Sequence, residues 1–287
     1  MKIKIHNLLI PSLLFFVAHF VSAASFDASS PAMIEKGAEF VSHISLRTES
    51  AEINALEGVV LYPRTILRLK EIRDGNSIVT FWVENPKESA SGEIRFSGVI
   101  PGGYQGERGA LFSLVFEGKD EGNGLITFSA GRVLLNDGEG TSASFLKTNT
   151  AITVIKGKEH EMKVAPITDN ELPETFIPEI GRDSALYNGQ WFVVFATQDK
   201  KSGIDHFEVR ESRWPFSGSF VRAESPYILK DQSLQSFLSI KAVDRSGNER
   251  IAEVSPKNLP WYENYKILSI LIVVAFALLF PFFRRRK

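Results

Sequence analysis

The middle of the chain alternates short hydrophobic runs with turn sequences. Between Phe40 and Ile155, nine runs rich in Val, Ile, Phe and Thr are broken by turn signals such as 74–76 (Asp-Gly-Asn) and 101–103 (Pro-Gly-Gly). No helical period of hydrophobic residues separates them. This spacing predicts an antiparallel β-sandwich, and about 115 residues can bury a core without cross-links.

The strand pattern stops after this region and then resumes. Residues 157–181 carry prolines and many charges, which predicts a linker that merges into the next strand. Residues 182–257 again alternate strand-like runs with turns at 199–203 and 244–248. About six or seven short strands in this length predict a smaller sandwich of the immunoglobulin or fibronectin-III type.

The two ends of the chain are hydrophobic but have different flanks. Residues 1–24 have an early pair of lysines, an apolar run and a close of small residues. This pattern predicts a secretory signal peptide cleaved near Ala23 or Ala24, with a retained N-terminal anchor as the alternative. Residues 267–283 are 17 uncharged residues, about 25 Å long as a helix, which is the short end of a membrane span.

The flanks of this second segment predict its orientation. The juxtamembrane residues 258–266 include Trp261, Tyr262 and Tyr265, and residues 284–287 are all basic. Aromatic side chains favour the membrane interface, and basic residues favour the cytoplasmic side. We therefore expect a single-pass transmembrane helix in the cell membrane, with extracytoplasmic N-terminal domains and a cytoplasmic C-terminus. A buried C-terminal helix and a removable sorting tail are the alternatives.

Composition narrows the chemistry. The 287 residues include 33 Lys plus Arg and 34 Asp plus Glu, a net charge of −1, so no nucleic-acid partner is expected. The absence of cysteine excludes disulfides, thiolate metal sites and a cysteine nucleophile. The five histidines are scattered, and no nucleotide-binding, metalloprotease or serine-hydrolase motif is present. We expect no catalytic residues, no enzyme activity and no cofactor, although the many carboxylates leave a glycosidase pair possible on composition.

Two acidic turns are candidate calcium loops. They are Asp137-Gly138-Glu139 and the segment 244–249, where Asp244, Ser246, Asn248 and Glu249 present oxygen atoms. Neither has the full EF-hand spacing, and Asp and Asn near Gly are typical of β-turns. We interpret both as turn residues and expect no metal site.

Three ordered segments of the first sandwich carry a family resemblance. They read NALEGVVLYP at 54–63, then IRFSG at 94–98 with PGGY at 101–104 and GALF at 109–112, and finally GRVLLNDGEGT at 131–141. In this order they resemble cohesin domains, over residues 35–155. The resemblance implies that residues 25–156 form a nine-stranded jelly-roll β-sandwich related to carbohydrate-binding modules. Cohesins of cellulosome scaffolds bind dockerins, so the resemblance also implies a dockerin-like protein partner. Residues 202–209 and 240–248 resemble small sandwich repeats of bacterial surface proteins.

The strand expected at residues 55–62 is the candidate docking strand. Alternation places one set of side chains toward the core, namely Leu56, Gly58, Val60 and Tyr62. The other set is predicted to bind the partner: Ala55, Glu57, Val59 and Leu61. Because both sets are largely apolar, either the strand is buried on both faces or the second set is an exposed partner surface. In cohesins the positions of Ala55 and Glu57 are polar, and Ala55 departs from that pattern.

The aromatic residues divide by context. Trp82 and Trp191 lie within dense apolar runs and are predicted to be core residues. Trp214, Phe216 and Tyr104 lie in expected loops or turns, where aromatic side chains can stack on a glycan or anchor a protein partner. Loops folded over the end of a sandwich are the alternative.

The sequence as a whole predicts a membrane-anchored, extracytoplasmic binding protein. Its cohesin-like module would dock a partner noncovalently, in polysaccharide degradation or in surface assembly. One alternative is a carbohydrate-binding module that binds polysaccharide through Trp214 and Tyr104. Another is a structural surface protein whose sandwiches contact one another without a small ligand.

Overall fold

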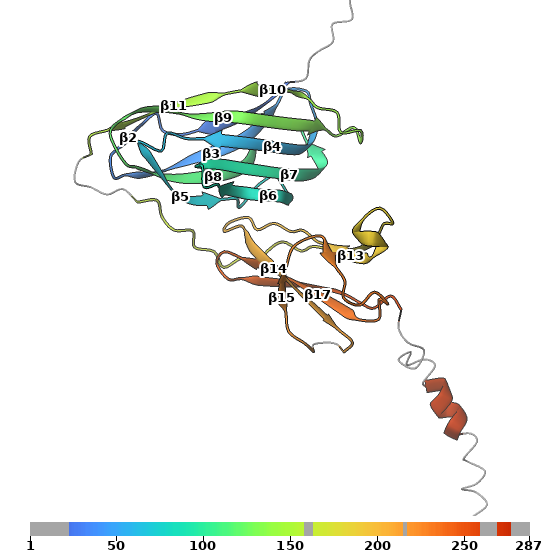
Figure 1. Cartoon of the computed structure of the whole chain (residues 1–287). Helices are drawn as coiled ribbons and strands as arrows, with labels where there is room; N and C mark the ends of the chain where they lie inside the picture. The colour runs from blue at the N-terminus through green and yellow to red at the C-terminus, as the bar shows by residue number, and fades with distance from the viewer. Residues whose placement is uncertain (1–22, 158–162, 215–216, 259–268, 277–287) are drawn as a thin grey trace, which may run out of the picture.

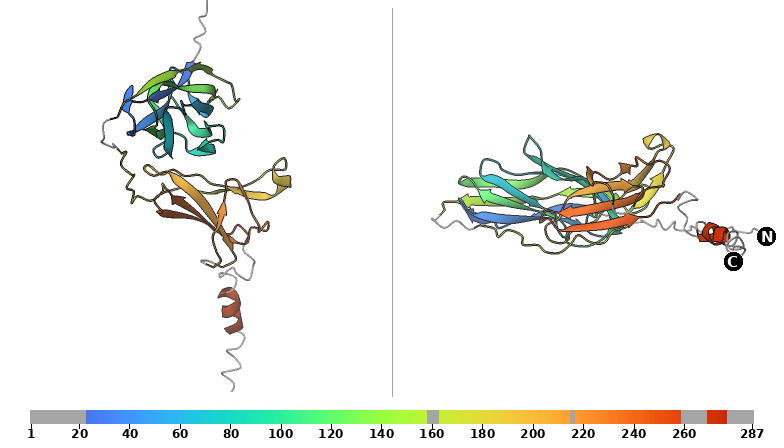
Figure 2. Two further views of the ribbon diagram at one scale, coloured as in Figure 1. Left: turned by 60° about the vertical axis from the view of Figure 1, so that its left-hand side comes forward. Right: turned by 90° about the horizontal axis from the view of Figure 1, so that it is seen from below.

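The structure, a computed structural model, describes residues 23–157, 163–214, 217–258 and 269–276. Two β-sandwiches follow one another along the chain and lie one above the other in Figure 1 and in the left view of Figure 2. The described residues are mostly β-strands in sandwich-like sheets, as predicted, with a short helix at 269–276. Among them, no helix is both long enough and apolar enough to cross a membrane.

The first sandwich has eleven strands in two sheets. The five-stranded sheet has the order β10-β1-β3-β8-β5, and the six-stranded sheet has the order β2-β11-β9-β4-β7-β6. The strands are β1 (Ala23–Ser29), β2 (Met33–Glu35), β3 (Glu39–Thr48), β4 (Ile53–Leu61), β5 (Leu67–Arg73), β6 (Phe81–Glu88), β7 (Glu93–Tyr104), β8 (Gly109–Gly118), β9 (Gly122–Leu135), β10 (Ser144–Lys147) and β11 (Asn149–Ile155).

Aromatic side chains fill the space between these sheets. In β3, residues alternate strictly between buried and less buried positions, as a strand with one core face requires. The rings of Phe26 and Phe96 meet edge to face with centroids 5.2 Å apart, and Phe112 meets Phe96 at 5.0 Å. Gly58 of β4 lies against this cluster, where a Cβ atom would collide with the rings of Phe26 and Phe96. The glycine therefore lets the sheet approach the rings closely.

The number of strands differs from the predicted nine. The runs expected at 124–131 and 132–136 form one continuous strand, β9, which passes an irregularity opposite Val59 and Val60. Three strands were not predicted: β1, β2 and β10. β1 is described from Ala23, and Ala24 is buried in the core, so small residues expected to end the signal peptide contribute to the sandwich.

The second sandwich has seven strands in sheets of three and four. The sheet orders are β12-β13-β16 and β15-β14-β17-β18. The strands are β12 (Glu179–Arg182), β13 (Trp191–Val194), β14 (Ile204–Ser212), β15 (Val221–Ala223), β16 (Tyr227–Ile228), β17 (Phe237–Asp244) and β18 (Glu249–Val254), with a short 3-10 helix at Tyr187–Gly189. Val193, Val209 and Ile240 lie at the centre of its core.

The segment between the sandwiches packs on both of them. The backbone N–H of Val164 donates to the Glu39 carboxylate of the first sandwich at 3.0 Å. Further along, the N–H of Glu174 donates to the Gln198 carbonyl at 2.8 Å, and Phe176 packs on the second core. The residues expected to link the domains therefore also contribute packing to the second one.

The loop between β5 and β6 makes a polar contact between the sandwiches. Asp74, which is buried, forms an ion pair with Arg245 of the second sandwich, and Arg245 Nη2 lies 3.1 Å from Asp74 Oδ2. Arg245 also donates to the Ser202 carbonyl at 3.0 Å. The N–H of Asn76 donates to the carbonyl of Asp199 at 3.3 Å. These contacts hold the two sandwiches together.

Candidate functional site

The outer face of the six-stranded sheet carries a row of apolar side chains. Register aligns four residues across four strands, all of intermediate exposure: Phe81 (β6), Val99 (β7), Ala55 (β4) and Leu134 (β9). We call these four residues the apolar row. Because they lie opposite the core face of β4, they point away from the packed interior.

The next two rows on the same face carry charges. In the first, Glu57 lies between Ser97 and Arg132, with Glu84 at the edge. In the second, Val59 lies between Arg95 and Ala130. Arg95 is held by Glu93 at 2.6 Å, whereas Glu57 takes part in no ion pair among the described residues. We call the apolar row and these two rows the docking face.

The structure places three of the four predicted partner-binding residues, Ala55, Glu57 and Val59, on the docking face, and Leu61 lies in the row beyond it. Leu56, Gly58 and Val60 are buried on the opposite side of β4, while Glu57 is exposed and Ala55, Val59 and Leu61 are partly exposed. The strand is therefore not buried on both faces. The sequence did not indicate Phe81, Val99, Leu134 or Arg132, because only strand pairing brings them beside β4.

The predicted aromatic residues do not form one site. Tyr104 ends β7, is partly buried and packs against the first core, which agrees with a folded-back turn rather than a free stacking platform. Trp214 lies after β14 in the second sandwich and is 67% exposed. Phe216 lies outside the described residues. Trp82 and Trp191 are partly buried and pack on the two cores, as expected.

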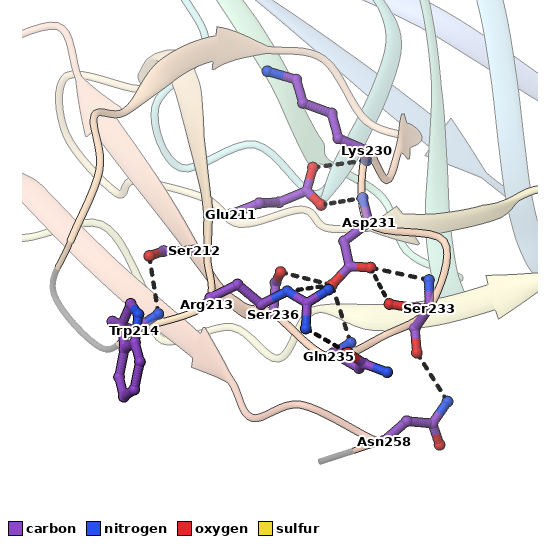
Figure 3. A network of polar contacts seen from close by, with 10 residues as sticks. All are labelled: Glu211, Ser212, Arg213, Trp214, Lys230, Asp231, Ser233, Gln235, Ser236 and Asn258. Atoms are coloured by element: carbon purple, nitrogen blue, oxygen red, sulfur yellow. Dashed lines mark hydrogen bonds and ion pairs between the residues drawn. The ribbon is translucent and has the colours of Figure 1, made fainter. Parts of the chain in front are cut away.

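A hydrogen-bonded turn supports the Trp214 region (Figure 3). The Asp231 carboxylate accepts hydrogen bonds from the Ser236 hydroxyl at 2.6 Å and from the backbone N–H of Ser233 and Gln235 at 3.0 and 3.1 Å. Burial alone would raise the pKa of Asp231, but the hydroxyls of Ser233 and Ser236 and the backbone donors outweigh it and lower the pKa to about 2. The turn at 231–236 is therefore held together by an ionised carboxylate.

This pKa predicts a pH dependence of stability. The folded value of about 2 lies below the ordinary 3.8, so the stabilisation is present near neutral pH and is lost as the pH falls toward 2. Because the side chain is partly solvated, we expect about 1 kcal/mol from this group. Thermal unfolding of the second sandwich between pH 7 and pH 2 measures it. Asp231→Asn should be less stable at neutral pH and lose less stability on acidification; an equal loss in both proteins would contradict the assignment.

Three buried aspartates converge in the second sandwich, which the sequence did not indicate. Carboxylate oxygens of Asp169, Asp199 and Asp244 lie within 4.8 Å of one another. Backbone donors hold each of them: Asp199 Oδ1 accepts from the N–H of Lys201 and Gly203, and Asp244 Oδ1 accepts from the N–H of Asn248. Oxygen atoms in this arrangement are donors that a hard divalent cation can use.

Hydrogen bonds keep the Asp169 carboxylate charged. Burial alone would raise the pKa of Asp169, but hydrogen bonds from Glu171 and Ser202 lower this pKa below its usual range. Asp244 forms the turn that the sequence predicted, and it also belongs to the group of three. In the other acidic turn, exposed Asp137 accepts from the N–H of Glu139 at 2.9 Å, which is ordinary turn geometry.

A cavity of about 370 Å³ lies between the two sandwiches. Trp82, Val83 and Asn85 line it from the first sandwich, and His206 and Arg222 line it from the second. His206 Nδ1 lies 2.6 Å from Asp205 Oδ2, so the imidazole is held in place. The lining mixes an indole and aliphatic carbon with polar groups.

A search of solved structures finds cohesin modules that are similar to part of this chain. No protein-family model matches the sequence, and no curated protein matches it. The cohesin module of a family 33 glycoside hydrolase from Clostridium perfringens is similar, with 14% identity, a TM-score of 0.40, and coverage of 48% of this chain and 98% of that module. A non-cellulosomal cohesin from the archaeon Archaeoglobus fulgidus has 16% identity, a TM-score of 0.40, and coverage of 47% and 92%.

A third similar structure is CaCohA2 from Clostridium acetobutylicum in solution. It has 12% identity and a TM-score of 0.35, with coverage of 46% of this chain and 90% of that one. CaCohA2 has also been solved in a complex with CaDoc0917. Each of these three matches covers about half of this chain.

Proposed function

We propose that the protein is a membrane-anchored, extracytoplasmic docking protein without catalytic activity. Its docking face binds a partner protein, and the resemblance to cohesins favours a dockerin-like helix pair. The observation that carries this proposal is the apolar row beside charged rows on a solvent-facing sheet. A mixed surface of this kind is typical of partner surfaces, which combine an apolar centre with a polar rim.

Binding would proceed by burial of the apolar row. Phe81 and Leu134 lie at the two ends of the row, and Ala55 leaves a shallow position between the larger side chains where a partner side chain fits. Each Å² of apolar surface removed from water contributes about 25 cal/mol before the costs of association are subtracted. Glu57 and Arg132 present opposite charges beside the row and would fix the orientation of the partner.

The membrane anchor is a separate part of the proposal. Apart from Ser269, the described helix at residues 269–276 is apolar, and its exposed side chains include Ile270, Val273 and Phe276. A helix that is hydrophobic on every side is stable when surrounded by protein or by lipid. The 17 uncharged residues at 267–283 and the basic residues at 284–287 favour lipid, with the N-terminal domains outside.

A matched pair of substitutions tests the docking face. Ala55→Arg puts a long charged side chain in the apolar row and should weaken binding of a dockerin-like helix pair at least about ten-fold. Ser45→Arg makes a similar change on the outer face of the five-stranded sheet and should leave binding unchanged. Titration calorimetry with purified helix-pair proteins measures both.

Two outcomes would contradict the proposal. If Ser45→Arg weakens binding as much as Ala55→Arg, the docking face is not the contact surface. If no helix-pair protein binds while glycan arrays give signals that Trp214→Ala removes, the carbohydrate-binding alternative holds instead. Self-association of the intact ectodomain in sedimentation, with neither ligand bound, would favour the structural alternative.

A further inference from the structure

An exposed tryptophan lies on the second sandwich, beyond the end of β14. The Trp214 side chain is 67% exposed, whereas Trp82 and Trp191 are partly buried against the cores. An indole has a large apolar body and one polar N–H, so it is favoured where an apolar phase meets water. The proposed docking face lies on the other sandwich and does not include this residue.

The backbone on either side of Trp214 is held in place. The N–H of Trp214 donates to Ser212 Oγ at 3.2 Å, and the Ser217 hydroxyl donates to the Trp214 carbonyl at 3.0 Å. The neighbouring Arg213 contacts the turn at 231–236 through a hydrogen bond to Gln235 and an ion pair with Asp231 (Figure 3). The backbone that carries the indole is therefore tied to this turn.

The same turn holds the point where the chain leaves the sandwich. The N–H of Asn258 donates to the Leu234 carbonyl at 3.0 Å, and its side-chain amide donates to the Ser233 carbonyl at 3.0 Å (Figure 3). The apolar run at 267–283 begins nine residues after Asn258. Even a fully extended connection of that length spans at most about 30 Å. The apolar run therefore starts no more than about 30 Å from Asn258.

The charges around Trp214 suit a lipid headgroup region. Two carboxylates lie here, and both are occupied by donors: Glu211 accepts from the N–H of Lys230 and Asp231 at 2.9 and 3.0 Å, and Asp231 accepts from its own turn. Arg213 adds a partly exposed guanidinium. An indole beside a cationic side chain is the combination found where proteins contact membrane interfaces.

We propose that the Trp214 side chain rests in the headgroup region of the bilayer that holds the C-terminal segment. This inference rests on the membrane anchor in the proposed function. The second sandwich is then more than a spacer on a flexible tether. It contacts the membrane at two points, Trp214 and the chain exit, and so fixes the direction in which the docking face points.

Site-directed spin labelling of the full chain tests this contact. The chain has no cysteine, so each introduced cysteine is unique. Ser219→Cys labels the connection that contains Trp214, and Thr141→Cys labels an exposed site on the first sandwich. In vesicles of phosphatidylcholine and phosphatidylglycerol, we expect the label at 219 to collide with a water-soluble nickel chelate about five-fold less often than the label at 141, as for a site at the headgroup level. Adding Trp214→Ala should remove this protection.

A third label separates failure of the contact from failure of the anchor. Ala275→Cys reports whether the apolar segment lies in the acyl chains. If this label is in lipid while the label at 219 is as accessible as that at 141, the anchor stands and the contact is wrong. Protection at 219 that persists with Trp214→Ala also overturns the role of the indole. A water-accessible label at 275 overturns both the anchor and the contact.

Discussion

Replacing Phe96 by alanine is expected to destabilise the first sandwich by about 3–5 kcal/mol, the range for a fully buried phenylalanine. Phe96 is 1% exposed and contacts Phe26 and Phe112 edge to face. The Phe96 ring also packs directly against Gly58, which has no side chain. Loss of the ring would therefore leave a cavity that no side chain of Gly58 can fill. No disulfide is present to limit the damage.

Hydrogen exchange of the β4 and β7 amides measures the stability of the first sandwich by itself. Such a local measurement is needed because a chain with two sandwiches does not have to unfold in one step. Phe81→Ala is the matched control. Phe81 lies on the outer face of the same sheet and is only partly buried, so its stability cost should be much smaller while partner binding weakens. Equal losses of stability in the two variants would contradict the described core.

The second large effect is expected at the contact between the sandwiches. Arg245→Ala leaves the buried Asp74 carboxylate without its guanidinium partner, at a cost of about 2–3 kcal/mol. Because Asp74 and Arg245 belong to different sandwiches, the loss should appear as reduced coupling between them. We expect separate calorimetric transitions and faster proteolysis within residues 157–181.

Lys200→Ala provides the control for this prediction. Lys200 pairs with Glu174 at 2.7 Å, but both groups are largely exposed and neither belongs to the first sandwich, so removal of Lys200 should change the coupling between the sandwiches little. A double-mutant cycle with Asp74→Ala gives the coupling energy of the pair itself. A coupling energy near zero, or unchanged proteolysis in Arg245→Ala, would show that this ion pair does not hold the sandwiches together.

The alternation of apolar and polar residues along each strand was enough to predict the two sandwiches and the exposed side of β4. Alternation along one strand separates Leu56 and Val60 from Glu57 because the two sets face opposite sides of the sheet. It could not predict that Phe81, Val99 and Leu134 align with Ala55, because register between strands depends on long-range pairing. β1 was missed because its small residues resemble the end of a signal peptide.

The three converging aspartates were missed for a similar reason. Asp169, Asp199 and Asp244 come from three separate segments, and each alone resembles an ordinary turn residue. One signal was present: both 199–203 and 244–248 place an aspartate a few residues before a glycine, as turns with side-chain caps do. That Asp169 joins them follows only from the path of the segment between the sandwiches.

Photo-crosslinking from the docking face shows whether a partner protein lies against this surface. A benzophenone side chain at Val59 places the reactive group among the charged rows, and the same group at His43 places it on the exposed outer face of the five-stranded sheet. In the native cell envelope, we expect a covalent adduct between the group at Val59 and a second protein, with no such adduct at His43. Adducts at His43 alone, or the same adducts at both positions, would show that the docking face is not the partner surface.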